Sequence, residues 1–206
     1  MSENPFLLFL GPVGVWSIAI LFFVWSAYAI QKEARTYLKK APWFEMGKKN
    51  LRIQMPPWWQ ERALTMKGRA LMEMLPSSSL SRFEPLSEFC DPKGEGLLVI
   101  LFREAPSERG APPEEQFLQF FQGGGLQLDH WEPERLFGDS SFQVWEVESR
   151  STHQVGEEEP LRLFFRANWV LGEGFELLFL YRTGVLAGLV DGYFWRKSIL
   201  SLKRGS

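Results

Sequence analysis

The sequence predicts an α+β protein with a single N-terminal transmembrane helix and one globular domain that contains an antiparallel sheet. Two observations predict this organisation. The run from Pro5 to Ile30 contains no charged residue, and after it come several short apolar segments separated by turn sequences. An apolar run of this length is typical of a membrane-spanning helix, because about 20 helical residues cross the hydrocarbon core of a bilayer. The predicted divisions are a transmembrane anchor at 1–30, a basic juxtamembrane linker at 31–49 and an α+β globular domain at 50–206.

The apolar run fits a retained anchor better than a cleaved signal peptide. A signal peptide has a positively charged start and a short apolar core, whereas this chain begins MSENP, without Lys or Arg. Ala27-Tyr28-Ala29 does have the small-x-small pattern of a cleavage site, so cleavage stays open as an alternative. A helix that begins at Pro12 would place Trp25 and Tyr28 near one membrane interface, where amphipathic rings are favoured.

Basic residues follow the apolar run on its C-terminal side only. Residues 31–52 carry seven Lys/Arg and two Glu, a balance of +5, whereas residues 53–206 carry sixteen Lys/Arg and twenty-two Asp/Glu, a balance of −6. The positive-inside rule then places the globular domain on the cytoplasmic side of the cell membrane, with a periplasmic or other extracytoplasmic location as the alternative. The basic segment is either a topology signal alone or a site for anionic lipid headgroups. The expected headgroup contacts are Lys32, Arg35, Lys39 and Lys40.

Aromatic residues are frequent in the apolar run and in the segment APWF that follows it. Their side chains are bulky enough to pack against a partner in the membrane, although a span that only faces lipid is an equally good interpretation. The expected membrane or partner contacts are Trp16, Phe22, Phe23, Trp25, Tyr28, Trp43 and Phe44.

The first part of the globular domain contains two predicted strands. Asn50–Met55 alternates apolar and polar residues, which indicates a half-buried strand, and Pro56-Pro57 ends it. Residues 63–75 fit either a helix or a strand. The sequence DPKG at 91–94 predicts a turn, and the continuous apolar run at 96–103 predicts a buried strand.

The second part predicts a helix, three strands and a closing helix. Pro112 suits the first turn of a helix, which the three glycines at 123–125 would end. Apolar segments at 141–149, 161–170 and 175–181 are joined by short loops and predict an antiparallel meander. Gly184–Leu202 has apolar residues at helical spacing and predicts the closing helix. The core residues expected between the last two strands and this helix are Leu163, Phe165, Leu178, Leu189 and Tyr193.

Two segments carry a resemblance to a known family. IQMPPWW (Ile53–Trp59) is similar to a first strand that runs into a Pro-x-Trp turn, and FWRKSILSLK (Phe194–Lys203) is similar to a final helix. With the order of elements between them, residues 50–206 resemble the PsbP-like α/β sandwich, shared by bacterial DcrB-type envelope lipoproteins and by extrinsic proteins of photosystem II. The chain departs from the family in lacking a lipobox cysteine, in its helical anchor and in residues 63–95. Family members mostly bind or assist other proteins, so the resemblance implies no catalytic residues.

The residues themselves show no pattern that indicates catalysis. His130 and His153 have no His or Cys neighbour at metal-ligand spacing. Cys90, the only cysteine, has no adjacent base, so we expect a buried, inert thiol. The glycines at 123–125 follow a predicted helix, whereas a phosphate cradle precedes one. We therefore expect no enzyme activity, no cofactor and no metal, and the acidic domain does not suggest nucleic-acid binding.

Two functions fit these observations. The first is a non-catalytic, single-pass accessory or structural subunit of a larger integral membrane protein complex, in contact with the lipid bilayer. The second is a membrane-tethered binding or chaperone-like module that holds a protein or peptide client.

Overall fold

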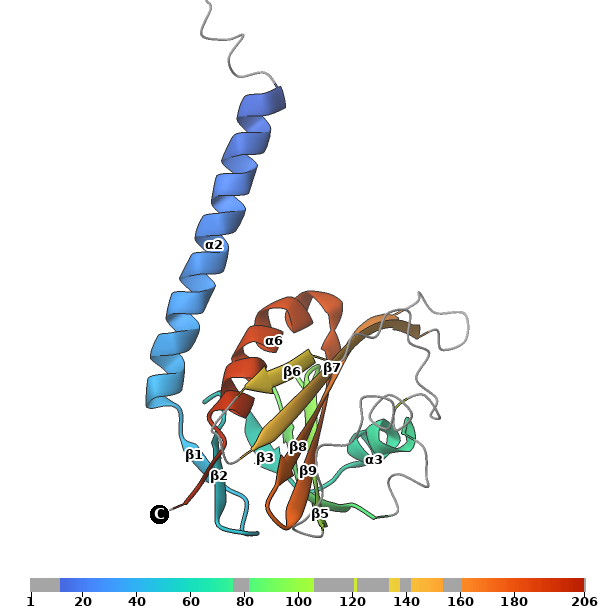
Figure 1. The fold of residues 1–206 in the computed structure, drawn as a ribbon. Coiled ribbons are helices and arrows are strands. Elements are labelled where there is room, and N and C mark those ends of the chain that lie inside the picture. The colour runs from blue at the N-terminus through green and yellow to red at the C-terminus, as the bar shows by residue number, and fades with distance from the viewer. Residues whose placement is uncertain are drawn as a thin grey trace, which may run out of the picture. The chain divides into compact units, whose positions relative to one another are not determined.

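The computed structural model describes residues 12–75, 82–105, 121, 134–137, 142–153 and 161–205. The chain divides into two compact units, of which the first ends at Lys40 and the second begins at Ala41. The first unit contains the helix α2 (Pro12–Lys40) (Figure 1). The elements of the second unit are β1 (Trp43–Glu45), β2 (Leu51–Gln54), β3 (Gln60–Arg62), α3 (Met66–Glu73), β4 (Glu84–Cys90), β5 (Leu97–Glu104), β6 (Glu134–Phe137), β7 (Gln143–His153), β8 (Leu161–Gly172), β9 (Phe175–Gly184), α6 (Val185–Leu200) and β10 (Lys203–Arg204).

The helix α2 ends directly before Ala41-Pro42, because the residue before a proline is displaced from the helical region. No helix within the described residues is both long enough and apolar enough to cross a membrane. The transmembrane helix expected at 1–30 stays a prediction, since residues 1–11 lie outside the described part of the chain. Many large apolar side chains of α2 are exposed, with exposed fractions between 59% and 73%. They are Val15, Trp16, Ile18, Ile20, Leu21, Phe22, Phe23, Val24, Trp25 and Tyr28.

The second unit begins earlier than the boundary at residue 50 expected from the sequence. The strand β1 lies within the expected linker and pairs antiparallel with β2, with Trp43 opposite Gln54 and Glu45 opposite Arg52. Strand β10 pairs with the other edge of β2, so that these strands form a three-stranded sheet in the order β1-β2-β10. The segment from Ala41 onward therefore belongs to the folded unit.

The larger sheet has seven strands in the order β3-β4-β5-β9-β8-β7-β6, and all its described neighbours are antiparallel. The predicted strands β5, β7, β8 and β9 are confirmed, and β7, β8 and β9 extend beyond their predicted ends. The turn between β8 and β9 contains Gly174 at φ +75°, a conformation that glycine adopts readily. A meander of long strands thus forms the middle of the domain.

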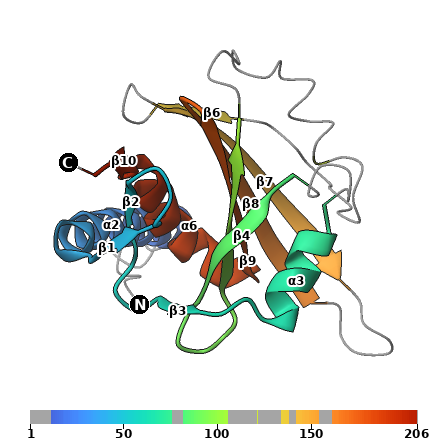
Figure 2. The same ribbon diagram turned by 90° about the horizontal axis from the view of Figure 1, so that it is seen from below.

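The large sheet is covered on both faces. Figures 1 and 2 show α6 and the three-stranded sheet on one face and α3 on the other. On the α6 face, Phe179 and Tyr181 of β9 form one core with Trp195. On the α3 face, Leu178 of β9 forms a second core with Leu71. Successive side chains of a strand point to opposite faces, so the continuous apolar run in β9 supplies both cores.

The predicted core of the β8–β9 hairpin is partly wrong. Phe165 and Leu178 are buried, as expected, but they lie in the core on the α3 face and not against the closing helix. The α6 face instead receives Phe164, the neighbour of Phe165. Because both faces are buried, the apolar run does not reveal which residues face which layer. Tyr193 is half-buried, and the side chains of Leu163 and Leu189 lie outside the described part.

Other predictions had mixed outcomes. The strand β2, its end at Pro56 and the closing helix α6 are confirmed, and the ambiguous segment at 63–75 forms α3. The strands β1, β3, β4, β6 and β10 were not predicted. The helix expected after Pro112 lies outside the described residues apart from Phe121, which is helical and buried.

Candidate functional site

The residues predicted to contact lipid or a partner lie in two different settings. The predicted aromatic contacts in α2 are all exposed, namely Trp16, Phe22, Phe23, Trp25 and Tyr28. Lys32, Lys39 and Lys40 in its C-terminal part are exposed as well. Arg35 lies in α2, but its side chain is outside the described part. The other predicted contacts, Trp43 and Phe44, lie in the second unit, on strand β1.

Trp43 and Phe44 point to opposite sides of the three-stranded sheet. Phe44 packs against the core on the α6 face and meets the ring of Phe89 edge to face, with ring centroids 4.9 Å apart. Phe44 therefore helps to close the core of its own unit. Trp43 lies on the outer side and is 38% exposed.

The outer side of the three-stranded sheet carries two cations beside Trp43. The guanidinium carbon of Arg52 lies 5.1 Å from the Trp43 ring centroid, and the Nζ atom of Lys203 lies 4.1 Å from it. Arg52 and Lys203 are direct cross-strand partners of β2 and β10. We call the surface formed by Trp43, Arg52 and Lys203 the cationic face.

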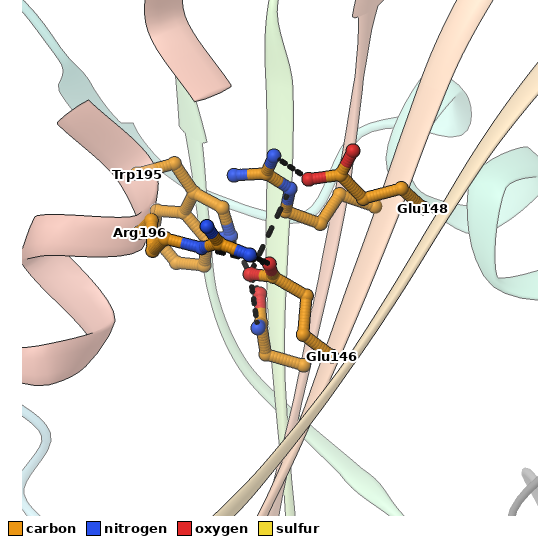
Figure 3. Close-up of polar contacts among 6 residues, drawn as sticks. Glu146, Glu148, Trp195 and Arg196 are labelled. Carbon is orange, nitrogen blue, oxygen red and sulfur yellow. Dashed lines mark hydrogen bonds and ion pairs between the residues drawn. The ribbon is translucent and has the colours of Figure 1, made fainter. Parts of the chain in front are cut away.

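A second polar group is buried between α6 and the large sheet (Figure 3). Its centre is the carboxylate of Glu146 on β7, which is almost completely buried. Arg196 of α6 donates to Oε1 of Glu146 from Nε at 3.0 Å and from Nη2 at 2.8 Å. Asn168 of β8 donates to Oε2 at 2.9 Å, and Nε of Arg166 lies 3.7 Å from the same oxygen.

Two further contacts extend this buried group. The guanidinium of Arg166 donates to Glu148, and the indole Nε1 of Trp195 donates to Asn168 Oδ1 at 2.8 Å. With Glu146 and Arg196, the group holds two carboxylates and two guanidinium groups, so its formal charges balance. Figure 3 shows that its members come from α6 and from the strands beneath it. The group therefore fixes α6 to β7 and β8 through satisfied charges.

The other buried carboxylates also have partners. Glu88 of β4 accepts from Nε of Arg62 at 2.8 Å and from the backbone nitrogen of Thr65 at 2.8 Å. Glu176 accepts from the indole of Trp169 at 3.0 Å and forms an ion pair with Arg103. Paired charges of this kind connect elements of the fold.

The residues considered for chemistry are not brought together in the described part. Cys90 is a free, buried thiol, which confirms its predicted burial. His153 is the last residue of β7, and its side chain is not described, whereas His130 lies outside the described residues. Across the described ranges, no three His, Cys, Asp or Glu side chains are grouped so that they could hold a metal ion.

Two shallow depressions lie on the surface of the second unit. One, of about 450 Å³, is formed by the end of β3 and the start of β4, including Arg62 and Leu86. The other, of about 590 Å³, is bordered by Lys48, Glu84 and Phe102. Lys48 and Glu84 form an ion pair of 2.8 Å there. Both depressions are open to solvent and lined by mixed charges.

Sequence reasoning did not identify Arg52 and Lys203 as members of one surface. The alternation in Asn50–Met55 was enough to place Arg52 on the outer side of its strand, opposite to the buried Leu51 and Ile53. Nothing local links Arg52 to Lys203, because the two residues meet only through the pairing of β2 with β10.

Comparisons with known proteins concern the fold. No protein-family model matches the sequence, and no curated protein matches it. The solution structure of cyanobacterial PsbP (CyanoP) from Synechocystis sp. PCC 6803 is similar, with a TM-score of 0.51 and 14% identity, covering 80% of this chain and 92% of its own. LpqN of Mycobacterium tuberculosis, described as involved in cell envelope biogenesis, has a TM-score of 0.43 and 11% identity, covering 80% of this chain and 91% of its own.

A protein from Bacteroides thetaiotaomicron has a TM-score of 0.45 and 12% identity over 76% of this chain, which spans 46% of that protein. CyanoP, which matches over most of both chains, agrees with the resemblance expected from the two terminal segments of the domain. The chain has an α+β, PsbP-like fold with antiparallel sheets.

Proposed function

We propose that this protein is a single-pass, membrane-anchored accessory or structural subunit of a larger membrane protein complex, and that it is not an enzyme. The observation that carries the proposal is the exposure of the apolar side chains of α2. A helix turns by about 100° per residue, so the consecutive residues Ile20–Trp25 cover every side of it. Each of these residues is at least 59% exposed.

An apolar surface on every side of a helix is suited to lipid or to neighbouring helices. A helix that docks on a globular domain needs only one apolar stripe, with polar residues on its opposite side. Burial of a large apolar side chain contributes about 1.5–3 kcal/mol, so a surface of this kind favours strong association with an apolar environment. The uncharged run of the sequence also begins at Pro5, before the first described residue of α2.

A charge placed in this helix tests the anchor. Phe23→Arg should weaken membrane association, because Arg at the centre of a spanning helix costs about 2.5–3.5 kcal/mol. The measurement is the share of full-length protein that stays with membranes after extraction at alkaline pH. Met66→Arg is the matched control, since Met66 lies on α3 and is 88% exposed. Equal extraction of the two variants would count against the anchor.

The orientation follows from the basic residues at the C-terminal end of α2. With Lys39 and Lys40 on the cytoplasmic side, the PsbP-like domain lies in the cytoplasm. Lys48 and Lys49 are exposed in the β1–β2 turn and offer sites for trypsin. Trypsin added to intact cells should leave the domain whole and should cleave it after the membrane is permeabilised. Cleavage in intact cells would reverse the orientation.

Native sizing in a mild detergent tests the subunit role. A stable subunit should migrate with a multi-subunit assembly much larger than its own 23.9 kDa plus detergent. A monomer that instead captures soluble proteins would favour the alternative, a membrane-tethered module that holds a client. The large sheet offers little room for a client on its middle strands, because both faces of β5 and β9 are covered.

A further inference from the structure

The outer side of the three-stranded sheet has an excess of positive charge, since Arg52 lies between Lys203 of β10 and the exposed Glu45 of β1. The buried charges of the domain are paired, whereas Arg52 and Lys203 form no ion pair with any of the residues that the structure describes. Like charges directly opposite each other on neighbouring strands are destabilising, and Arg52 and Lys203 occupy such a pair of positions. Glu45 offsets one of these charges, and an anion in front of Arg52 and Lys203 would offset the other.

The chemistry of the cationic face suits phosphate groups at a membrane surface. Arginine donates in a planar fork that matches a phosphate, and lysine adds a point charge. An exposed tryptophan ring is favoured at the headgroup level of a bilayer. The Nε atom of Arg52 is buried and has no hydrogen-bond partner among the described residues, so the guanidinium is held beside the Trp43 ring and not by a neighbouring carboxylate.

The covalent chain keeps this surface close to the C-terminal end of α2. Only Ala41 and Pro42 separate Lys40 from Trp43. Three extended residues span at most about 11 Å, which is close to the Debye length of about 8–10 Å at moderate ionic strength. If α2 is the anchor, its last ten residues extend about 15 Å beyond Ile30 along the helix axis, and a tilted α2 brings Trp43 to the headgroups.

We propose that the cationic face of the three-stranded sheet binds anionic phospholipid headgroups beside the anchor. This inference rests on the proposed membrane anchor and adds a second lipid contact, made by the folded domain. Arg52 lies near the start of the domain, and Lys203 lies near the end of the chain. Because the contact places both residues at one bilayer surface, it would hold the domain in one orientation at the membrane.

Hydrogen–deuterium exchange of the full chain in liposomes tests the contact. The liposomes contain phosphatidylcholine alone or phosphatidylcholine with phosphatidylglycerol, and the reporter is the segment 42–55, which includes the edge strand β1. We expect slower exchange with phosphatidylglycerol, and we expect added salt to reduce the difference. Each basic residue near an anionic bilayer strengthens association about fivefold. Arg52→Gln combined with Lys203→Gln should therefore weaken the protection about 25-fold.

The matched control is Lys67→Gln combined with Lys93→Gln. Both lysines are exposed on α3 and on the β4–β5 turn, and this variant loses the same net charge. Protection that persists in the Arg52/Lys203 variant, or that disappears equally in the control, would overturn the inference. Equal exchange of the wild-type segment 42–55 in the two kinds of liposome would also overturn the inference. Protection found only in native membranes would overturn it as well, because it indicates a protein partner.

Flotation separates this inference from the anchor. Wild-type protein that floats with phosphatidylcholine alone retains the anchor, even if the exchange of segment 42–55 shows no lipid dependence. Protein that floats only with phosphatidylglycerol has no anchor of the proposed kind but keeps the lipid contact of the cationic face. Protein that floats with neither kind of liposome overturns both.

Discussion

Trp25 of α2 is 66% exposed, whereas Trp195 of α6 is 3% exposed, although both lie in helices rich in apolar residues. The difference lies in what surrounds each helix. Trp195 has the rings of Phe179 and Tyr181 beside it, with centroids 5.5 and 6.2 Å away. The large sheet thus supplies the apolar environment of α6. The large apolar side chains of α2 are exposed, and in the proposed function lipid or another protein supplies their environment.

The two helices also differ in how their charged residues are used. Arg196 of α6 reaches the buried carboxylate of Glu146, so that a charge helps to attach the helix to the sheet. Lys39 and Lys40 of α2 are exposed at its C-terminal end. Arg196 of α6 therefore acts inside the fold, whereas Lys39 and Lys40 of α2 are available to the surroundings.

The largest expected effect comes from removing the same side chain in each helix. Trp195→Ala should lower the stability of the domain by about 3–5 kcal/mol, because it opens a cavity and leaves Asn168 without its indole donor. The melting temperature in detergent should fall on the order of 10 °C. Trp25→Ala should leave that melting temperature unchanged. Similar shifts in both variants would show that α2 contributes to the stability of the domain.

The buried ion group should come next. Glu146→Gln leaves Arg166 and Arg196 without the negative charge of their shared partner, and the breaking of a buried pair costs about 3 kcal/mol or more. Glu84→Gln is the control, since its ion pair with Lys48 is largely exposed and contributes about 1 kcal/mol or less. Chemical denaturation measures both values. A small loss for Glu146→Gln would mean that packing alone holds α6 on the sheet.

The smallest effect concerns two threonines, one that caps a helix and one within a helix. Thr65 caps the N-terminus of α3 by accepting from Gly68 and also contacts Glu88, so Thr65→Ala should cost about 1–2 kcal/mol. Thr36 in α2 donates to the carbonyl of Lys32 and is exposed. Thr36→Ala should not destabilise the helix, because alanine has the higher helix propensity. The unfolding free energy of the domain and the helix content by circular dichroism distinguish the two effects.

Features encoded by neighbouring residues were predictable from the sequence. The end of α2 depends on Pro42, and the strands β2, β5, β8 and β9 follow from local apolar patterns and adjacent turns. The resemblance to PsbP-like proteins rested on the two segments at the ends of the domain, and the fold agrees with it. The lipid or partner contacts of α2 were predicted from composition alone, and they stay a prediction.

Strand β4 shows why other elements were missed. Its sequence EPLSEFC contains two acidic residues and a proline, which are unfavourable in strands. Its stability depends on pairing with β5 and on the contacts of Glu88 with Arg62 and Thr65. These partners lie in other elements, so no local pattern indicates them.

The sequence alone determined where the chain is apolar, where it is charged and where β2, β5, β7, β8, β9 and α6 lie, because these features depend on residues close together in the chain. Only the tertiary structure decided that Phe165 faces α3, that Glu146 joins Arg166 to Arg196, and that Lys203 lies beside Arg52 and Trp43. The physical reason is that strand pairing and layer packing select contacts among many distant residues of similar chemistry, and that choice is made by the fold as a whole.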